Sequence, residues 1–482
     1  MIQLSRYLLA AFALAAGEAC GYALVRFSPI WPGITVISAV ILVFGYAFSW
    51  RWWKTAAFFL LGLVLMFRYF DSRNRFLREN FQGHGRFETS FTIEDAPRIP
   101  TPSSGKEPWI SFPSSVSGIA VRVIFQQEPG SVPPVPGEVW RCSGWMQGGN
   151  AADITRRPFW IRGEGTFARR EQEALSNSWR THASALRKEL ARRIGIGLEH
   201  RSDLAALNRA ILLGNRTGLT SETRSVFANA GTTHIFSVSG LHVVVIAGVL
   251  RILLALLFVP ARLCSLILIP ILWTYILTIG SPPSAVRAGA MASLHFLAPL
   301  VWRRPDGLVA WTITFIAVHI LAPEMLLNTG SLLSFSVMLG ILLFLKWGEP
   351  LGNRNMPTGA FGVSFAAWAA GAPIVAYTFG TITPGALLAN ILLMPAATLS
   401  VSAGALGVLA SCISNTLAAH INNAAALCTD AMVGVSWAVS RLPGSNFPSG
   451  QWRLWECAAW YALVILAFWL VRSIVLRRRS AL

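Results

Sequence analysis

Hydroxyl, imidazole and guanidinium groups gather in one short stretch of a largely apolar chain. The stretch covers residues 210–247 and reads AILLGNRTGLTSETRSVFANAGTTHIFSVSGLHVVVIA. Polar groups inside apolar segments cost free energy unless they face protein or water, so this cluster favours a bundle interior or a wet path. The competing interpretation is that the histidines only bond to neighbouring backbone. The residues that could carry chemistry are Asn215, Arg216, His234, Ser239, Gly240 and His242.

Two short helices are expected before the two histidines. Gly214 suits the C-cap of the first helix, because glycine adopts the left-handed conformation that ends many helices. Asn215 and Arg216 then begin a polar turn. Thr220 is expected to start the second helix, with Glu222 in its first turn.

A long helix is expected over residues 234–259. At about 100° per residue, His234 and His242 would lie roughly 80° apart around its axis. Gly240 would lie well away from both. This spacing predicts a close helix contact through Gly240 and a polar arc on the other side.

The composition excludes a soluble globular protein. Of the 482 residues, 54% are hydrophobic and 13% are charged, whereas a soluble domain carries about 25% charged residues. The six cysteines form no CxxC pair and no Cys/His metal spacing. No nucleotide-binding P-loop is present. We therefore expect no metal and no cofactor.

Apolar stretches long enough to cross a bilayer recur along the chain and predict about twelve membrane spans. Cations in short loops mark the cytoplasmic side, and their positions place both termini in the cytoplasm. The Pro-rich segment near Ser281 could instead be re-entrant. The predicted spans are residues 8–25, 31–49, 55–70, 234–259, 263–280, 284–300, 307–323, 330–347, 360–378, 384–411, 417–442 and 454–473.

Residues 71–170 predict a small β-domain outside the membrane. Gly, Pro and Ser separate short runs of alternating polarity, which are typical of strands. An antiparallel barrel or sandwich would bury one face of these strands. A loop is expected over 97–113, and the predicted strands are residues 86–94, 118–126, 138–146 and 158–163.

Aromatic and cationic residues give this region two possible roles. The net charge of the chain is +18, and arginines outside the membrane would attract phosphates. The aromatics could stack the bases of a single strand, although an ordinary β core is the simpler interpretation. Residues 171–200 predict an amphipathic helix that lies on the membrane surface or packs on its own domain. The aromatic candidates are Trp140, Trp145, Phe159 and Trp160.

Three motifs resemble the ComEC family of bacterial competence proteins. The family pattern is approximately LLGDR, then a helix, then G-x-x-H-x-x-x-x-S-G-L-H-V. This sequence departs from it at Asn215, where the family usually has Asp, which puts a role of that acid in doubt. PSAVRA at 283–288 and LLNTGSLLSF at 326–335 resemble two further motifs. The matches to the first pattern are Leu212, Leu213, Gly214, Arg216, Gly231, His234, Ser239, Gly240, Leu241, His242 and Val243.

The resemblance implies an inner-membrane channel that takes up single-stranded DNA in natural transformation. The fold that it implies is polytopic α-helical with an extracytoplasmic OB-like β-domain. It divides the chain into N-terminal helices (1–70), the β-domain (71–170), linker helices (171–230) and a channel domain (231–482). Its partners would be single-stranded DNA and membrane lipids, and a separate nuclease, a DNA receptor and a cytoplasmic ATP-driven motor could assist. The implied channel residues are Asn215, Arg216, His234, Ser239, Gly240, His242 and Arg287.

Longer family members carry a C-terminal metallo-β-lactamase-like hydrolase domain. Such a domain needs an H-x-H-x-D-H cluster to hold its metals. The eight histidines of this chain form no such cluster. We therefore expect a short form that is not an enzyme.

Two other functions compete with the channel. Ser237-Val238-Ser239-Gly240 with His242 loosely resembles the nucleophile site of an intramembrane serine protease, but without a clear oxyanion device. A transporter of lipids or small solutes also fits the composition. An inverted repeat would support the transporter, and we see none in the sequence.

Overall fold

The computed structural model contains two units, which we describe separately. One unit comprises residues 1–189 and 319–327, and the other comprises residues 190–318 and 328–482. The first three predicted spans, at 8–25, 31–49 and 55–70, lie almost wholly outside the described residues and stay predictions. The described residues are 14–16, 60–62, 64–65, 86–93, 109–116, 119–126, 139–147, 159–163, 168–169, 179–215, 218–236, 238–347 and 356–480.

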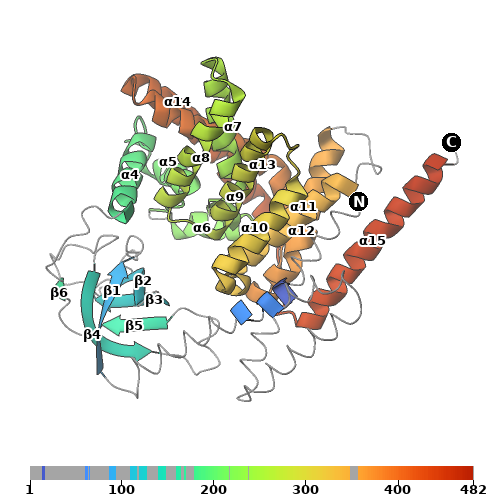
Figure 1. The fold of residues 1–482 in the computed structure, drawn as a ribbon, viewed down its shortest axis with the longest axis horizontal. Coiled ribbons are helices and arrows are strands. Elements are labelled where there is room, and N and C mark those ends of the chain that lie inside the picture. The colour runs from blue at the N-terminus through green and yellow to red at the C-terminus, as the bar shows by residue number, and fades with distance from the viewer. Residues whose placement is uncertain are drawn as a thin grey trace. The chain divides into compact units, whose positions relative to one another are not determined.

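Five strands of the first unit close into a ring (Figure 1). β1 pairs antiparallel with both β2 and β4, β2 pairs with β3, and β3 and β4 both pair with β5. The ring order is therefore β1-β2-β3-β5-β4. The strands are β1 (Arg86–Ile93), β2 (Trp109–Val116), β3 (Ile119–Gln126), β4 (Val139–Gln147), β5 (Phe159–Gly163) and the short β6 (Ala168–Arg169), which pairs with β4.

Four of these strands coincide closely with the predicted ones, but β2 does not. The loop prediction for 97–113 is wrong at its end, because β2 begins at Trp109. The strand reads WISFPSSV, and its proline and serines are residues that normally interrupt strands.

Helices dominate the rest of the chain. The amphipathic helix predicted over 171–200 is described from residue 179, and the prediction is wrong at its end, because the helix stops at Ile194. The helices from α8 to α15 begin close to the predicted starts of the spans. The elements are α4 (Trp179–Ile194), α5 (Ser202–Leu213), α6 (Ser221–Asn229), η1 (Thr233–Phe236), α7 (Gly240–Leu256), α8 (Ala261–Thr278), α9 (Pro283–Leu297), η2 (Ala298–Val301), α10 (Gly307–Leu321), η3 (Pro323–Leu327), α11 (Thr329–Trp347), α12 (Met356–Phe379), α13 (Gly385–Ala410), α14 (Asn415–Ser440) and α15 (Leu454–Ser480), with the strand pair β7 (Thr381–Ile382) and β8 (Phe447–Pro448).

Five of the described helices are long and apolar enough to cross a membrane. This is the architecture of a polytopic helical membrane protein. α14 is long but is not one of the five. The total of about twelve spans stays a prediction. The five segments are Ala261–Thr278, Pro283–Val301, Thr329–Lys346, Gly359–Phe379 and Gly385–Ala410, and shorter apolar helices cover Gly240–Leu256, Gly307–Leu321 and Leu454–Leu470.

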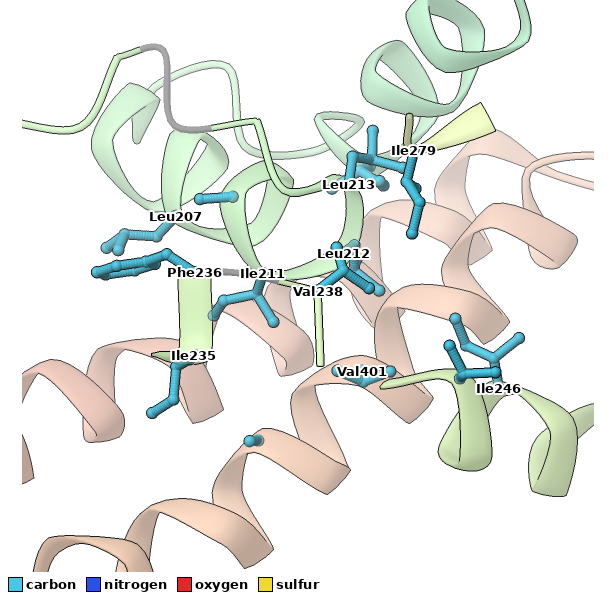
Figure 2. Packing of buried hydrophobic residues seen from close by; sticks show 14 of the residues in the cluster. Leu207, Ile211, Leu212, Leu213, Ile235, Phe236, Val238, Ile246, Ile279 and Val401 are labelled. Atoms are coloured by element: carbon cyan, nitrogen blue, oxygen red, sulfur yellow. The ribbon is translucent and has the colours of Figure 1, made fainter. Parts of the chain in front are cut away.

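The main hydrophobic core of the second unit forms around α5. This helix is apolar on most of its circumference, and most of its residues are buried, as expected of a helix that is covered on several sides. Figure 2 shows its Leu212 and Leu213 beside Val238 and Ile279. A Cβ atom on Gly404 of α13 would overlap the side chain of Leu212. The two helices therefore approach as closely as a glycine allows.

Both predicted helix ends next to this core are confirmed. Gly214 ends α5 in the left-handed conformation with φ 65°. Thr220 starts α6, where its hydroxyl accepts the backbone N–H of Thr223 at 3.1 Å. Caps of these types satisfy backbone groups that a helix end leaves without partners.

Candidate functional site at the start of α7

The two histidines of the motif lie in different elements. His234 is an exposed residue of the 3₁₀ turn η1, and His242 is a buried residue in the first turn of α7. The prediction of one helix over 234–259 is therefore wrong at its start, and so is the 80° angle between the rings. Ser239 ends the irregular segment, because serine is favoured at the N-cap position where it stands.

The His242 ring caps its own helix and presents a buried donor. Its Nδ1 accepts the backbone N–H of Ser239 at 3.0 Å. A neutral ring with an accepting Nδ1 carries its hydrogen on Nε2. Nε2 is buried and has no hydrogen-bond partner among the described residues. One N–H donor of His242 thus remains available to an acceptor.

The Ser239 hydroxyl lies 2.9 Å from the same Nδ1 of His242. A serine nucleophile needs a base within this distance, and the base in turn needs a third group that orients it. Here the ring nitrogen also accepts the backbone N–H of Ser239, and the opposite nitrogen has no acceptor in the described part of the chain. The contact is that of a helix cap and gives the protease interpretation no support.

Gly240 lets α9 approach the start of α7. A Cβ atom there would lie 2.9 Å from Nη2 of Arg287 and 3.3 Å from Cβ of Ala288. The Ser284 hydroxyl also donates to the carbonyl oxygen of Val238 at 2.8 Å. The predicted close contact through Gly240 is confirmed, and its partner is the helix that carries Arg287.

Arg287 is buried in apolar surroundings, with 4% of its surface exposed. Its Nη1 lies 4.0 Å from the Met291 sulfur, and its Cζ lies 5.9 Å from the centre of the Phe335 ring. Its Nε has no acceptor, and no carboxylate of the described residues pairs with it. A buried cation without a counter-charge is costly, so such residues mark functional sites more often than structural ones.

Asn215 and Arg216 follow the end of α5. Asn215 is half-buried, while Arg216 lies outside the described residues. The Tyr275 hydroxyl of α8 donates to the Leu212 carbonyl oxygen at 2.6 Å, which holds this end of α5 against α8. The motif residues therefore come from the end of α5, from η1 and from α7, and Arg287 comes from α9.

The aromatic candidates on the strands fall into two groups. Paired residues share a face of a sheet, and successive positions alternate between faces. Trp140 pairs with Phe91 of β1, and Phe159 pairs with Val121 of β3. The register places these positions on a face where most positions of the five strands are apolar.

The other two aromatics share the opposite face with arginines. Trp145 pairs with Arg86 of β1 and with Arg162 of β5. Trp160 is two positions from Arg162 on β5 and pairs with Arg122 of β3. This face, which we call the Trp–Arg face, also includes Arg141 of β4 and Trp109 of β2, so it combines three tryptophan positions with four arginine positions.

A buried polar network was not predicted from the sequence. Oγ1 of Thr429 on α14 lies 2.6 Å from Oδ1 of Asn208 on α5 and 2.9 Å from Oγ of Ser400 on α13. Small polar residues inside apolar helices are the only signal that could have indicated it. Among the described residues, no group of three or more His, Cys, Asp or Glu side chains could hold a metal ion.

Comparisons with known proteins place the α7–α9 site inside a matched region. The family profile described as "Competence protein" matches residues 211–473. ComE operon protein 3 of Bacillus subtilis (strain 168) is 26% identical over 212 residues, which cover 43% of this chain and 26% of that protein. An uncharacterized protein of Aquifex aeolicus (strain VF5) is 31% identical over 193 residues, which cover 40% of this chain and 45% of that protein. Each alignment covers less than half of the relative's length. No solved structure matches the chain significantly.

Proposed function

This chain belongs to the competence protein family, and from that premise we propose that it forms an inner-membrane channel for single-stranded DNA in natural transformation. The observation that carries the proposal is the family match over residues 211–473. This region contains the buried donors of His242 and Arg287. Donors without acceptors in an apolar bundle suit a substrate that brings its own negative charge.

The proposed passage runs past the start of α7. Conduction requires sites that bind a substrate weakly enough to release it again. A sulfur atom and an aromatic ring are weak partners for a guanidinium. Its N–H groups can therefore donate to one phosphate and then release it for the next. We propose that Arg287, His242, Ser239 and His234 line the passage, that Gly240 sets its width, and that Asn215 and Arg216 contribute to it.

We propose that residues 71–170 form an OB-like domain on the outer side of the membrane. An OB-fold is a five-stranded barrel that binds oligonucleotides on one side, and the ring order β1-β2-β3-β5-β4 fits that topology. Burying the apolar face inside the ring is the arrangement of lower free energy. Trp140 and Phe159 then belong to the core, while Trp145 and Trp160 stack bases on the Trp–Arg face.

The remaining features complete the proposal. Both termini lie in the cytoplasm, and about twelve helices cross the membrane. Because the sequence contains no P-loop, a cytoplasmic motor supplies any ATP-driven pulling. A DNA receptor delivers the strand, and a separate nuclease removes its complement.

Deletion of the gene tests the channel. In a competent host, the deletion strain should bind DNA outside the inner membrane but accumulate no nuclease-protected DNA in the cytoplasm. Transformation should then fall to the background frequency, and a plasmid copy of the gene should restore it. Unchanged transformation in the deletion strain would remove the channel proposal.

A further inference from the structure

Hydrogen-bond donors exceed acceptors where α7, α9 and α11 meet. Nε2 of His242 and Nε of Arg287 are both buried without a hydrogen-bond partner in the described part of the chain. Nη1 of the guanidinium contacts a thioether sulfur at 4.0 Å, which is a weak acceptor. Buried polar atoms in folded proteins nearly always have partners, so this pair of orphan donors calls for a ligand.

The guanidinium of Arg287 lies against the first turn of α7. Nη2 of Arg287 lies 2.9 Å from the position that a Cβ atom would occupy on Gly240, the first residue of α7. The N-terminus of a helix carries a partial positive charge, and its first N–H groups point away from the helix. His242 lies in the same first turn. The Arg287 guanidinium therefore lies beside a helix start, and the first turn of the same helix carries the buried ring N–H of His242.

We infer that the first turn of α7 and Arg287 form a binding site for one phosphodiester group of the translocating strand. The inference rests on the proposed function and names what its central residues bind. A phosphodiester supplies two anionic oxygens, which match a guanidinium and an imidazole N–H as donors. No carboxylate of the described residues competes for Arg287. The Met291 and Phe335 contacts hold the guanidinium in place without satisfying it.

Salt dependence of DNA binding tests this site. The full-length protein is placed in phosphatidylcholine nanodiscs, and binding of a fluorescent oligothymidylate is measured over a range of salt concentrations. Each phosphate contact contributes about −0.7 to the slope of log K against log salt for single strands. Arg287→Gln should reduce the slope by about that amount and weaken binding roughly tenfold at low salt. Arg287→Lys should keep the slope of the wild type.

Matched variants separate the site from general charge. Arg251→Gln removes an exposed cation from the same helix, α7, and should leave the slope unchanged. Gly240→Ala keeps every charge but displaces the guanidinium, and should weaken binding severalfold. If Arg287→Gln does not insert into nanodiscs, Gly240→Ala decides, and wild-type affinity of that variant overturns the inference.

A lipid headgroup offers the same phosphodiester chemistry. Native mass spectrometry after addition of phosphatidylglycerol counts the lipids that each variant retains. A loss of bound lipid in Arg287→Gln with an unchanged DNA slope would assign the site to lipid and overturn our inference. An unchanged slope combined with lost transformation would also overturn it but would leave the channel standing. Normal transformation in the deletion strain would remove the channel whatever the slope.

Discussion

At the scale of single residues, we expect Arg287 to lower the stability of the protein while serving its proposed function. Its guanidinium is buried against a sulfur atom and an aromatic ring, without a carboxylate from the described residues. Removing both charge and donors from such a position relieves a desolvation cost, because apolar replacements of buried charges are often neutral or stabilising. A passage for a polyanion would explain why the cation stands there.

Arg287→Met should therefore separate stability from transfer. The unfolding midpoint of the purified protein should stay constant or rise. A rise would correspond to an increase of about 1 kcal/mol or more in the free energy of unfolding. Transformation frequency should fall roughly tenfold, because an acceptor of the strand loses its charge-assisted donor. Arg251→Met is the matched control and should change neither value appreciably. A lower midpoint together with normal transformation would make Arg287 a structural residue.

Residue identities alone could not reveal this site fully. The motif indicated His242, Gly240 and the contact through Gly240, because a glycine between polar residues suggests close helix packing. It could not show that His242 bonds back to Ser239. That bond caps the N-terminus of α7, so the helix begins at Gly240 and His234 lies outside it. Capping of this kind depends on one rotamer, which apolar periodicity does not report.

At the scale of elements, α5 joins the linker region to α13 and α14. Its Leu212 packs on Gly404, and its Asn208 takes part in the network with Thr429 and Ser400. Contacts of this kind link residues that are far apart in sequence. One sequence can predict each helix from its apolar run but cannot predict which helices touch. The strand β2 was missed for a related reason.

Only two residue pairs join β1 to β2, at Thr92–Ser115 and Ile93–Ser114. Over the rest of its length β2 resembles an edge strand, and edge strands tolerate a proline such as Pro113. The local composition of residues 109–116 therefore predicted a loop, whereas their pairing with β3 makes them a strand. The split of the four aromatics between two faces also required the register, which no single strand reveals.

The contact between α5 and α13 yields a prediction at this scale. Gly404→Ala adds a methyl group that overlaps Leu212, and such overpacking typically costs about 1–3 kcal/mol. The unfolding midpoint of the purified protein should fall. Gly248→Ala in α7 is the control, because a Cβ atom there meets nothing within 4 Å, and it should be neutral or mildly stabilising.

A second substitution checks the cause. Leu212→Ala removes the overlapping atoms, so the pair Gly404→Ala and Leu212→Ala should be less destabilised than the sum of the single effects. Equal effects of the Gly404 and Gly248 variants would show that α5 does not pack as described.

At the scale of the whole molecule, the chain combines a strand-built unit with a helical bundle, and the proposal gives them successive tasks. The Trp–Arg face attracts phosphates and stacks bases, and the start of α7 passes the strand onward. Each task uses cations, but the arginine positions of the strands belong to one unit and Arg287 to the other. Substitutions on the Trp–Arg face should therefore mainly impair capture of DNA, and substitutions at the start of α7 should mainly impair its transfer.

Combined substitution of Trp145 and Trp160 by alanine should weaken binding of single-stranded DNA by the full-length protein, by about 1–3 kcal/mol for each lost stack. Arg287→Met should weaken this binding less than the double tryptophan variant does, by roughly tenfold, and should also reduce nuclease-protected DNA in cells. Alanine at Trp140 and Phe159 is the control, because it should lower the unfolding midpoint of the strand unit instead. Equal loss of DNA binding from both aromatic pairs would contradict the assignment of the faces.

Gly240 determines which substitutions the contact between α7 and α9 can accept. Gly240 presents only a hydrogen atom to the guanidinium of Arg287, and a Cβ atom there would displace that guanidinium and press on Cβ of Ala288. The same glycine therefore determines both how closely α9 approaches α7 and where the cation lies. If the strand passes here as proposed, a substitution at Gly240 would change the width of the passage and its electrostatics together.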